Sequence, residues 1–222
     1  MSDQTVGNVL ERHGLPPGPE RKKTTTWKEF IRTHLDVLAA TDFFTTEVWT
    51  RAGLVTYYVL FFIHVASRRV HIAGLTPYPN TAWMGQIARN TTMADSGFLS
   101  PGEYLLHDRD SKFTEAFDET LKAAGVKAVK LPAQSPNLNA HAERFVLSVK
   151  TECLSRVILF GEASLRRALS QFLEHYHGER PHQGKGNRIL FPEEAANAAR
   201  AGQVKCRERL GGLLRFYYRQ AG

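Results

Sequence analysis

The sequence predicts a mixed α/β domain in which three antiparallel strands are followed by strands that alternate with helices. One observation is the run "GLVTYYVLFFIHVA", which is rich in β-branched and aromatic residues and is typical of a buried strand. A second is that the later short apolar segments, "EYLLHD" and "VKAVKLP", are separated by segments with helical spacing. A third is the length of 222 residues, of which 42% are hydrophobic, enough for one good-sized domain with extensions. The order of elements favours a single mixed sheet with helices on its faces.

The N-terminal segment predicts short helices joined by a linker. Residues 4–13 read as the end of a helix, and "GLPPGPERKK" reads as a proline-rich basic linker. Thr26 and Glu29 have the spacing of a capping box, which predicts a helix over about 27–35.

The next segments predict a three-stranded antiparallel meander. We expect strands over 36–44, 53–66 and 69–76, with a tight turn at Ser67 and Arg68. Beyond it, helices and strands alternate. Helices are expected over 81–94, 114–125, 141–159 and 162–176, and strands over 103–108, 126–132 and 211–219.

Several classes of protein are excluded by composition. The longest apolar run, Tyr57 to Ile63, is far shorter than the roughly 20 residues of a membrane helix. The N-terminus has no signal-peptide layout. Cys153 and Cys206 are too few for a disulfide framework or a four-cysteine zinc site. We therefore expect a cytoplasmic protein with no membrane partner.

The net charge of +7 is unevenly distributed: +2 over 1–34, zero over 35–160 and +5 over 161–222. Basic ends around a neutral core suit a polyanionic partner, although plain solubility explains them equally well. If that partner is a nucleic acid, we expect the C-terminal tail to contact its phosphates without reading sequence. The alternative is that "GGLLRFYYR" is a strand that completes the fold or a dimer contact. The tail cations concerned are Arg200, Lys205, Arg207, Arg209, Arg215 and Arg219.

Three carboxylates stand out by their place in the predicted elements. Asp42 lies inside an apolar strand, where an ionised carboxylate is costly unless it is paired or bound to metal. Asp108 ends the fourth strand, so the two acids can meet if the first and fourth strands are neighbours. Glu143 lies at the edge of the apolar stripe of the long helix, and Lys150 lies nearly above it on the same edge.

Each acid also has a purely structural interpretation. Asp42 could be a strand-end or turn residue, and Asp108 and Asp110 could cap the following helix. Glu143 could be a first-turn acid favoured by the helix dipole. Taken together, the spacing of the acids favours a metal site beside a phosphate backbone.

The stretches "TDFF", "HDRDSKF" and "SPNLNAHAERFVLSVKTECL" resemble the integrase core of bacterial insertion-sequence transposases and retroviral integrases. "WKEFIRTHLDVLAATDFF" and "HYHGERPHQG" resemble the stretches that flank that core, so the resemblance covers about residues 5–185. It implies a ribonuclease H-like fold. It also implies three regions: an N-terminal arm and linker (1–35) that could be the remnant of a helix-turn-helix region, an integrase catalytic core (36–185) and a basic C-terminal extension (186–222).

By this resemblance, Asp42, Asp108 and Glu143 form the catalytic and metal-binding Asp-Asp-Glu set. The 34 residues between Asp108 and Glu143 are close to the gap usual in the family, whereas Asp110 would leave 32. Phe113 also follows Asp108 at the five-residue step that the family pattern expects. Asp108 is therefore the expected ligand and Asp110 the turn residue.

The resemblance implies a transposase or integrase that cleaves double-stranded DNA, at transposon ends, and transfers its strands into target DNA. It implies two Mg²⁺ ions, with Mn²⁺ as a substitute, a homo-oligomer on DNA, and a bacterial protein located at the nucleoid when active. The residues expected to contact DNA are Lys112, Asn139, Arg144 and Lys150; of these, Asn139 is expected to orient the loop before Glu143.

Three other functions remain open at this point. The first is a ribonuclease H-like nuclease without strand transfer. The second is a catalytically decayed DNA-binding remnant. The third is a zinc protein that uses His175, His177 and His182, for which no fourth ligand is evident.

Overall fold

The computed structural model describes residues 3–14, 26–132, 139–192 and 203–219. The chain divides into two compact units, Met1–His34 and Leu35–Gly222. The first unit contains helices α1 (Asp3–Arg12) and α2 (Trp27–His34). The predicted capping box is present, because the Glu29 amide donates to Thr26 Oγ1 at 3.3 Å and the Thr26 amide donates to Glu29 Oε2 at 3.1 Å.

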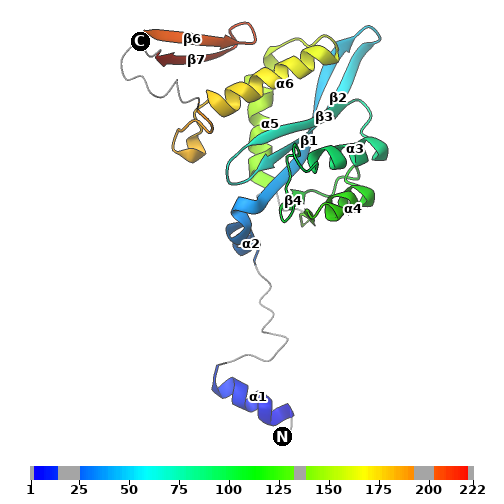
Figure 1. The fold of residues 1–222 in the computed structure, drawn as a ribbon, viewed down its shortest axis with the longest axis vertical. Helices are drawn as coiled ribbons and strands as arrows, with labels where there is room; N and C mark the ends of the chain where they lie inside the picture. Colours follow the sequence, from blue (N-terminus) through cyan, green and yellow to red (C-terminus); the bar gives the residue numbers. More distant parts are fainter. Residues whose placement is uncertain (1–2, 15–25, 133–138, 193–202, 220–222) are drawn as a thin grey trace. The chain divides into compact units, whose positions relative to one another are not determined.

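The second unit is built on a five-stranded sheet with the order β3-β2-β1-β4-β5. Figure 1 labels the first four of these strands, β1 to β4. Strand β1 pairs antiparallel with β2, which pairs antiparallel with β3, while β1, β4 and β5 run parallel. This confirms the mixed sheet and the ribonuclease H-like fold that the sequence predicts. The strands are β1 (Leu38–Thr50), β2 (Gly53–His64), β3 (Val70–Thr76), β4 (Tyr104–His107) and β5 (Lys127–Lys130), and a 3₁₀ turn, Leu35–Val37, precedes β1.

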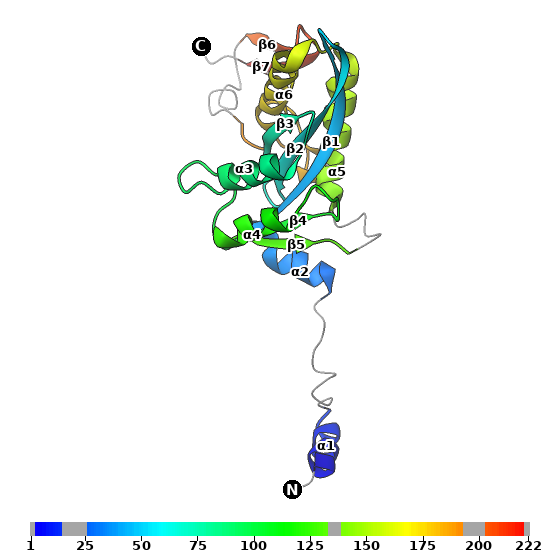
Figure 2. The ribbon, with the colours of Figure 1, turned by 90° about the vertical axis from the view of Figure 1, so that its right-hand side faces the viewer.

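Helices cover both faces of the sheet. Figure 2 shows α3 (Thr81–Thr91) and α4 (Glu115–Ala123) on one face and α5 (Ala140–Glu152) on the opposite face. Helix α6 (Gly161–Gly178) packs on α5, where the Phe145 and Phe172 ring centroids are 6.2 Å apart. Among the described helices, none has the length and apolar character needed to cross a membrane.

The apolar run of β2 is buried on both sides because its side chains alternate between the two helical layers. Leu60 and Phe62 join the core under α3 and α4. Phe61 faces the other way, and its ring centroid lies 4.8 Å from that of Phe145 on α5. All three β2 side chains are fully buried. A strand buried on both faces reads as a continuous hydrophobic run, which is why its position could be predicted.

Two predicted boundaries are wrong: β1 is longer than predicted because its residues 45–50 pair with residues 53–58 of β2, and the long helix is shorter because the chain turns back toward the sheet. Strand β1 continues to Thr50 instead of ending at residue 44, and the helix predicted over 141–159 ends at Glu152, before a 3₁₀ turn. The chain leaves the helix and returns to the end of β1, where the Trp49 amide donates to the Leu159 carbonyl at 2.9 Å. This pairing of distant segments overrides the apolar spacing that continues past Cys153.

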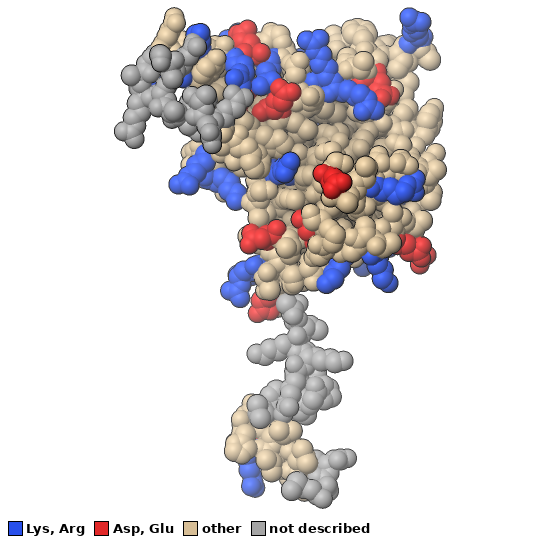
Figure 3. Space-filling model, in the orientation of Figure 1, with Lys and Arg blue, Asp and Glu red and all other residues tan. Residues whose placement is uncertain are grey.

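The C-terminal residues form a hairpin of β6 (Val204–Arg209) and β7 (Leu214–Arg219). The prediction of a strand over 211–219 is confirmed in its position, but β6 was not predicted, since "VKCRER" is largely polar. The hairpin contacts α6 through the Leu210 amide, which donates to Gln171 Oε1 at 2.8 Å. In Figure 3, cations and carboxylates intermingle at the end of the molecule where α6 and this hairpin lie.

Candidate active site

The sheet brings the two predicted aspartates to the same edge. In the parallel pairing of β1 with β4, Ala40 lies opposite Leu106. Asp42 and Asp108 each follow two residues later, so they come to the same level, just where β4 ends. The condition under which the two acids can meet, that the first and fourth strands are neighbours, is therefore fulfilled.

Glu143 approaches the same region from the helix that covers this face. Asp42 shares a strand face with Phe44, whose ring centroid lies 5.9 Å from that of Phe61. Phe61 in turn packs on Phe145, two residues after Glu143 in the first turns of α5. A line of three aromatic rings thus connects the strand that carries Asp42 to the helix that carries Glu143.

The electrostatics of Asp42 report on these neighbours. Burial raises the pKa of Asp42, and the negative charges of Asp108, Glu143 and Asp110 raise it further, to about 6. The Phe43 amide, which donates to Asp42 Oδ1 at 2.7 Å, acts in the opposite direction. Four carboxylates therefore influence one another at this edge, and the half-buried one is destabilised in its ionised form.

The chemistry of this donor set fits a hard divalent cation. Carboxylate oxygens are the ligands that Mg²⁺ prefers. In the described part of the chain, Asp42, Asp108 and Glu143 form no ion pair with a lysine or arginine. Within the same residues, no three His, Cys, Asp or Glu side chains are already arranged to hold a metal ion. Close convergence of the three acids on a metal thus stays a prediction.

Asp110 differs from Asp108 because it is already paired. Asp110 accepts a bond from the Lys112 amide at 2.9 Å, and its Oδ2 lies 2.7 Å from Lys112 Nζ. Burial acts to raise the pKa of Asp110, but the bonds and charge of Lys112 outweigh it and lower that pKa. Asp108 is exposed and accepts the Asp110 amide at 3.0 Å, as in a turn. These contacts favour Asp108 over Asp110 as the metal ligand.

His107 supports the backbone at this point. The side chain is fully buried, and its ring centroid lies 4.7 Å from that of Phe113. Its Nδ1 donates to the Asp108 carbonyl at 2.8 Å, and its Nε2 lies 3.2 Å from Asp118. Burial lowers the pKa of His107. The neutral ring therefore fixes the chain where Asp108 leaves the sheet.

The four predicted DNA-contact residues lie in different places. Lys112 is held by Asp110, with its Nζ 5.2 Å from the centroid of the Tyr58 ring. Lys150 lines a cavity of about 600 Å³ that is bordered by residues of β1. Asn139 is buried immediately before α5, and its Oδ1 has no hydrogen-bond partner among the described residues.

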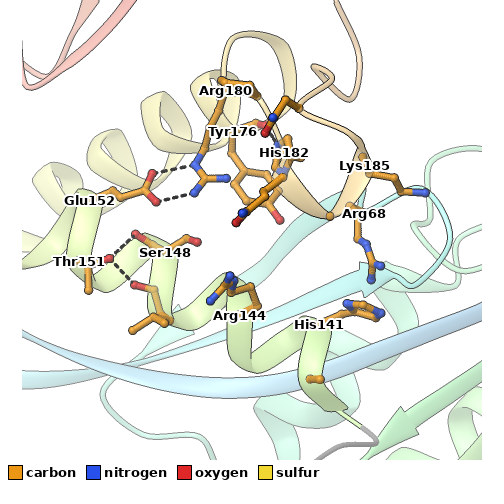
Figure 4. A pocket seen from close by; sticks show the side chains of 16 residues that line it. Arg68, His141, Arg144, Ser148, Thr151, Glu152, Tyr176, Arg180, His182 and Lys185 are labelled. Atoms are coloured by element: carbon orange, nitrogen blue, oxygen red, sulfur yellow. Dashed lines mark hydrogen bonds and ion pairs between the residues drawn. The ribbon is translucent and has the colours of Figure 1, made fainter.

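Arg144 faces a different cavity, which sequence reasoning missed (Figure 4). Arg68, His141, Arg180 and Lys185 also line it. The pKa of His141 is lowered to about 4, first by burial and then by the charges of Arg68 and Lys185. The residues come from separate segments, and the sequence signals were only the predicted turn at Arg68 and the stretch "HYHGERPHQG".

The three histidines of the zinc alternative face separate partners. His175 Nδ1 lies 3.0 Å from Glu179 Oε2, and His182 Nε2 donates to the Tyr176 carbonyl at 2.7 Å. His177 Nε2 accepts the Val70 amide at 2.9 Å. Each ring already has a structural partner, and no metal-holding group of three occurs in the described ranges. The zinc alternative gains no support.

Comparisons with known proteins support the fold. Residues 124–189, which include Glu143, match the family model described as "Integrase core domain". A chain of the simian T-cell lymphotropic virus intasome, in complex with PP2A regulatory subunit B56 gamma, is 12% identical with a TM-score of 0.50; the match covers 83% of this chain and 66% of that chain. The chain thus spans just under two thirds of the length of that relative. No curated protein matches significantly.

The HTLV-2 integrase catalytic core domain, solved in complex with magnesium in a dimeric form, is 10% identical with a TM-score of 0.47. That match covers 70% of this chain and 93% of the HTLV-2 chain.

Proposed function

We propose that this chain belongs to the integrase-core superfamily and is a DNA transposase or integrase, which cleaves phosphodiester bonds and transfers strands between duplexes with the help of a divalent metal. The observation that carries the proposal is that Asp42 and Asp108 come to the same level at one sheet edge, with Glu143 near enough for its charge to raise the pKa of Asp42. There burial and the neighbouring carboxylates raise the pKa of Asp42 to about 6. An acid cluster without a cation partner among the described residues suits a site that recruits one.

Two Mg²⁺ ions, or Mn²⁺ ions in their place, would be held by Asp42, Asp108 and Glu143. When bound, Mg²⁺ stabilises the charge that develops on the phosphate in such reactions. The chain's own contribution is position: β1 fixes Asp42, His107 fixes the backbone of Asp108, and α5 presents Glu143. Positioning and charge stabilisation account for most of the rate in phosphoryl transfer, so no side-chain nucleophile is required.

The substrates would be double-stranded transposon ends and target DNA. Lys150, Lys112 and Arg144 are the proposed phosphate contacts, and Asn139, buried next to α5, is proposed to orient the chain before Glu143. We further propose a homo-oligomer on DNA and a bacterial insertion-sequence origin, with the protein at the nucleoid when active. The arm over 1–35 and the extension over 186–222 would contribute to DNA binding outside the core.

The test is a strand-transfer assay with labelled duplex DNA and Mg²⁺. We expect Asp108→Asn to abolish product, because it removes a ligand charge, whereas Asp110→Gly should leave activity within a few-fold. Longer, joined products distinguish strand transfer from hydrolysis, in which only shortened strands appear. Loss of activity in the Asp110 variant together with an active Asp108 variant would show that the ligand assignment is wrong. Hydrolysis without joining would favour the nuclease.

A further inference from the structure

A basic cavity of about 610 Å³ lies beside the first turns of α5, and Figure 4 shows the residues around it. Its walls come from α5, the end of α6, the turn between β2 and β3, and the segment 180–187. The volume falls within the roughly 300–1,000 Å³ of small-ligand sites. Four cationic side chains line the cavity: Arg68, Arg144, Arg180 and Lys185.

Only one of these cations is neutralised by a carboxylate. Arg180 forms a two-bond pair with Glu152, at 2.8 and 2.6 Å, and its guanidinium lies 5.9 Å from the Tyr176 ring centroid. Among the described residues that line the cavity, Glu152 is the one acid. Among the described residues, no carboxylate pairs with Arg68, Arg144 or Lys185. Three positive charges without a carboxylate partner among the described residues therefore line one cavity that is open to solvent.

Arg68 provides the most specific sign of a ligand. Its Nη1 is buried and has no hydrogen-bond partner in the described part of the chain. The residue also has a φ of 66°, in the left-handed region that a non-glycine residue adopts at a cost. A buried guanidinium nitrogen without a partner is expensive, because it loses its hydrogen bonds to water and makes none in their place. Burial accordingly lowers the pKa of Arg68.

We propose that this cavity binds a phosphate group, held by Arg68, Arg144 and Lys185. Guanidinium groups match phosphate oxygens with paired bonds, and an ammonium adds a point charge. Three cations suit a phosphate, with its three or more acceptor oxygens, better than a carboxylate with two. Ser148, Gln183 and Asn187 supply neutral polar groups around the same space.

The proposal that the cavity binds phosphate does not depend on the proposed function. The further step, that this phosphate belongs to a DNA strand, rests on the proposed function. Arg144 directly follows Glu143, so the cavity and the acid cluster lie on adjoining sides of the same helical turn. A strand with one phosphate in the cavity would run past the acids. The cavity would then set the position of the strand relative to the cleavage point.

The experiment compares two triple variants with the same loss of charge. The cavity variant removes the three cations that have no described carboxylate partner, by Arg68→Asn, Arg144→Gln and Lys185→Gln. Asparagine is chosen at position 68 because it suits the left-handed backbone there. The control carries Arg89→Gln, Lys122→Gln and Arg167→Gln, three exposed residues outside the cavity. Both are measured without metal and again in an Asp42→Asn background, so that a failure of catalysis leaves the result readable.

The probes are inorganic phosphate, a 5′-nucleotide and a short labelled duplex. Binding is followed by calorimetry, by fluorescence anisotropy and by the amide NMR signals of residues 183–187. We expect phosphate to shift those signals in the unaltered chain and in the control, but not in the cavity variant. For the duplex, we expect the cavity variant to lose about tenfold in affinity and about one unit of the log–log salt slope, as for one lost phosphate contact.

The outcomes separate the sources of the phosphate. Loss of both phosphate and duplex binding in the cavity variant supports a DNA phosphate. Loss of phosphate or nucleotide binding alone supports a site for free phosphate and overturns the DNA source. No binding of any probe at the cavity, or equal losses in the control, overturns the proposal.

A single Arg68→Asn variant guards against a folding defect. Because its Nη1 has no described partner, its removal should leave the thermal midpoint unchanged or higher. A lower midpoint would mean that Arg68 is structural, and would count against the proposal.

Discussion

Two carboxylate clusters in this protein have opposite electrostatic settings. At the sheet edge, Asp42 is half-buried among other acids, and its pKa is raised to about 6. At the end of α6, Glu179 is 2% exposed at its side chain, with Arg209 at 2.7 Å, Arg207 at 3.2 Å and His175 at 3.0 Å. Burial acts to raise the pKa of Glu179, but bonds to Arg209, His175 and Arg207 outweigh it and lower that pKa.

Glu179 is an acid that stabilises the fold, whereas Asp42 is an acid that has no cation partner among the described residues. Glu179 ties the C-terminal hairpin to α6, with a further ion pair between Arg209 and Glu174. Asp42 contributes nothing comparable, so its ionised form costs stability that only a bound cation offsets. Removal of the charge should therefore have opposite effects on stability at the two sites.

The largest effect is expected for Glu179→Gln. This change leaves Arg207 and Arg209 without their buried acid, so we expect the free energy of unfolding to fall by about 3 kcal/mol. Urea denaturation at pH 7 measures it. A variant as stable as the unaltered chain would contradict the contrast between Glu179 and Asp42, because the hairpin would then not depend on this cluster.

Asp42→Asn should act in the other direction. The pKa of Asp42 is raised in the folded chain, so its ionisation above pH 6 opposes folding; the variant should gain about 2 kcal/mol at pH 7 and much less at pH 4. Mg²⁺ should raise the thermal midpoint of the unaltered chain but not that of the variant. A variant less stable at pH 7 would contradict the interpretation of this cluster.

Acid should weaken the fold through the buried histidines. The pKa of His177 is lowered to about 4 by burial and by the charges of Arg69 and His182, and its Nε2 must be unprotonated to accept the Val70 amide. A histidine with a lowered pKa binds its proton more readily when unfolded, so stability falls as pH drops from about 6.5 to about 4. Unfolding midpoints across that range should decline less steeply in His177→Gln.

The smallest effect is expected at the surface of the hairpin. Arg215 and Glu208 form an ion pair at 3.1 Å, but both side chains are more than half exposed. Arg215→Gln should change stability by less than about 0.5 kcal/mol, since exposed pairs are screened by water and salt. A loss as large as that of Glu179→Gln would show that the hairpin depends on its exposed charges as much as on its buried ones.

The strands of the sheet, in their order along the chain, could be predicted because they are specified locally. The position of β2 is indicated by the continuous apolar run around Phe61 and by the turns at its two ends, without reference to the rest of the sequence. The placement of Asp42 and Asp108 followed from the alternation along β1 and the end of β4. Glu143 followed from the family resemblance and the helical stripe.

The parts that could not be predicted depend on contacts between distant segments. The end of α5 is decided by the pairing of Leu159 with Trp49, about half the chain away. Strand β6 is stabilised by its bonds to β7 and to α6. Such polar contacts require no alternation of apolar residues, so "VKCRER" carries no strand pattern. The basic cavity draws Arg68, Arg144 and Lys185 together from three elements, so no single stretch of sequence carries its signature.

The row of rings from Phe44 through Phe61 to Phe145 has a consequence for how this protein can change over evolutionary time. These side chains belong to the core, yet they also set the separation between the strand that bears Asp42 and the helix that bears Glu143. A substitution that makes one of these side chains smaller would change the distance between β1 and α5 even though none of the three acids is altered. We therefore expect the volumes of these three rings to vary together among related chains if the acids are to keep their spacing.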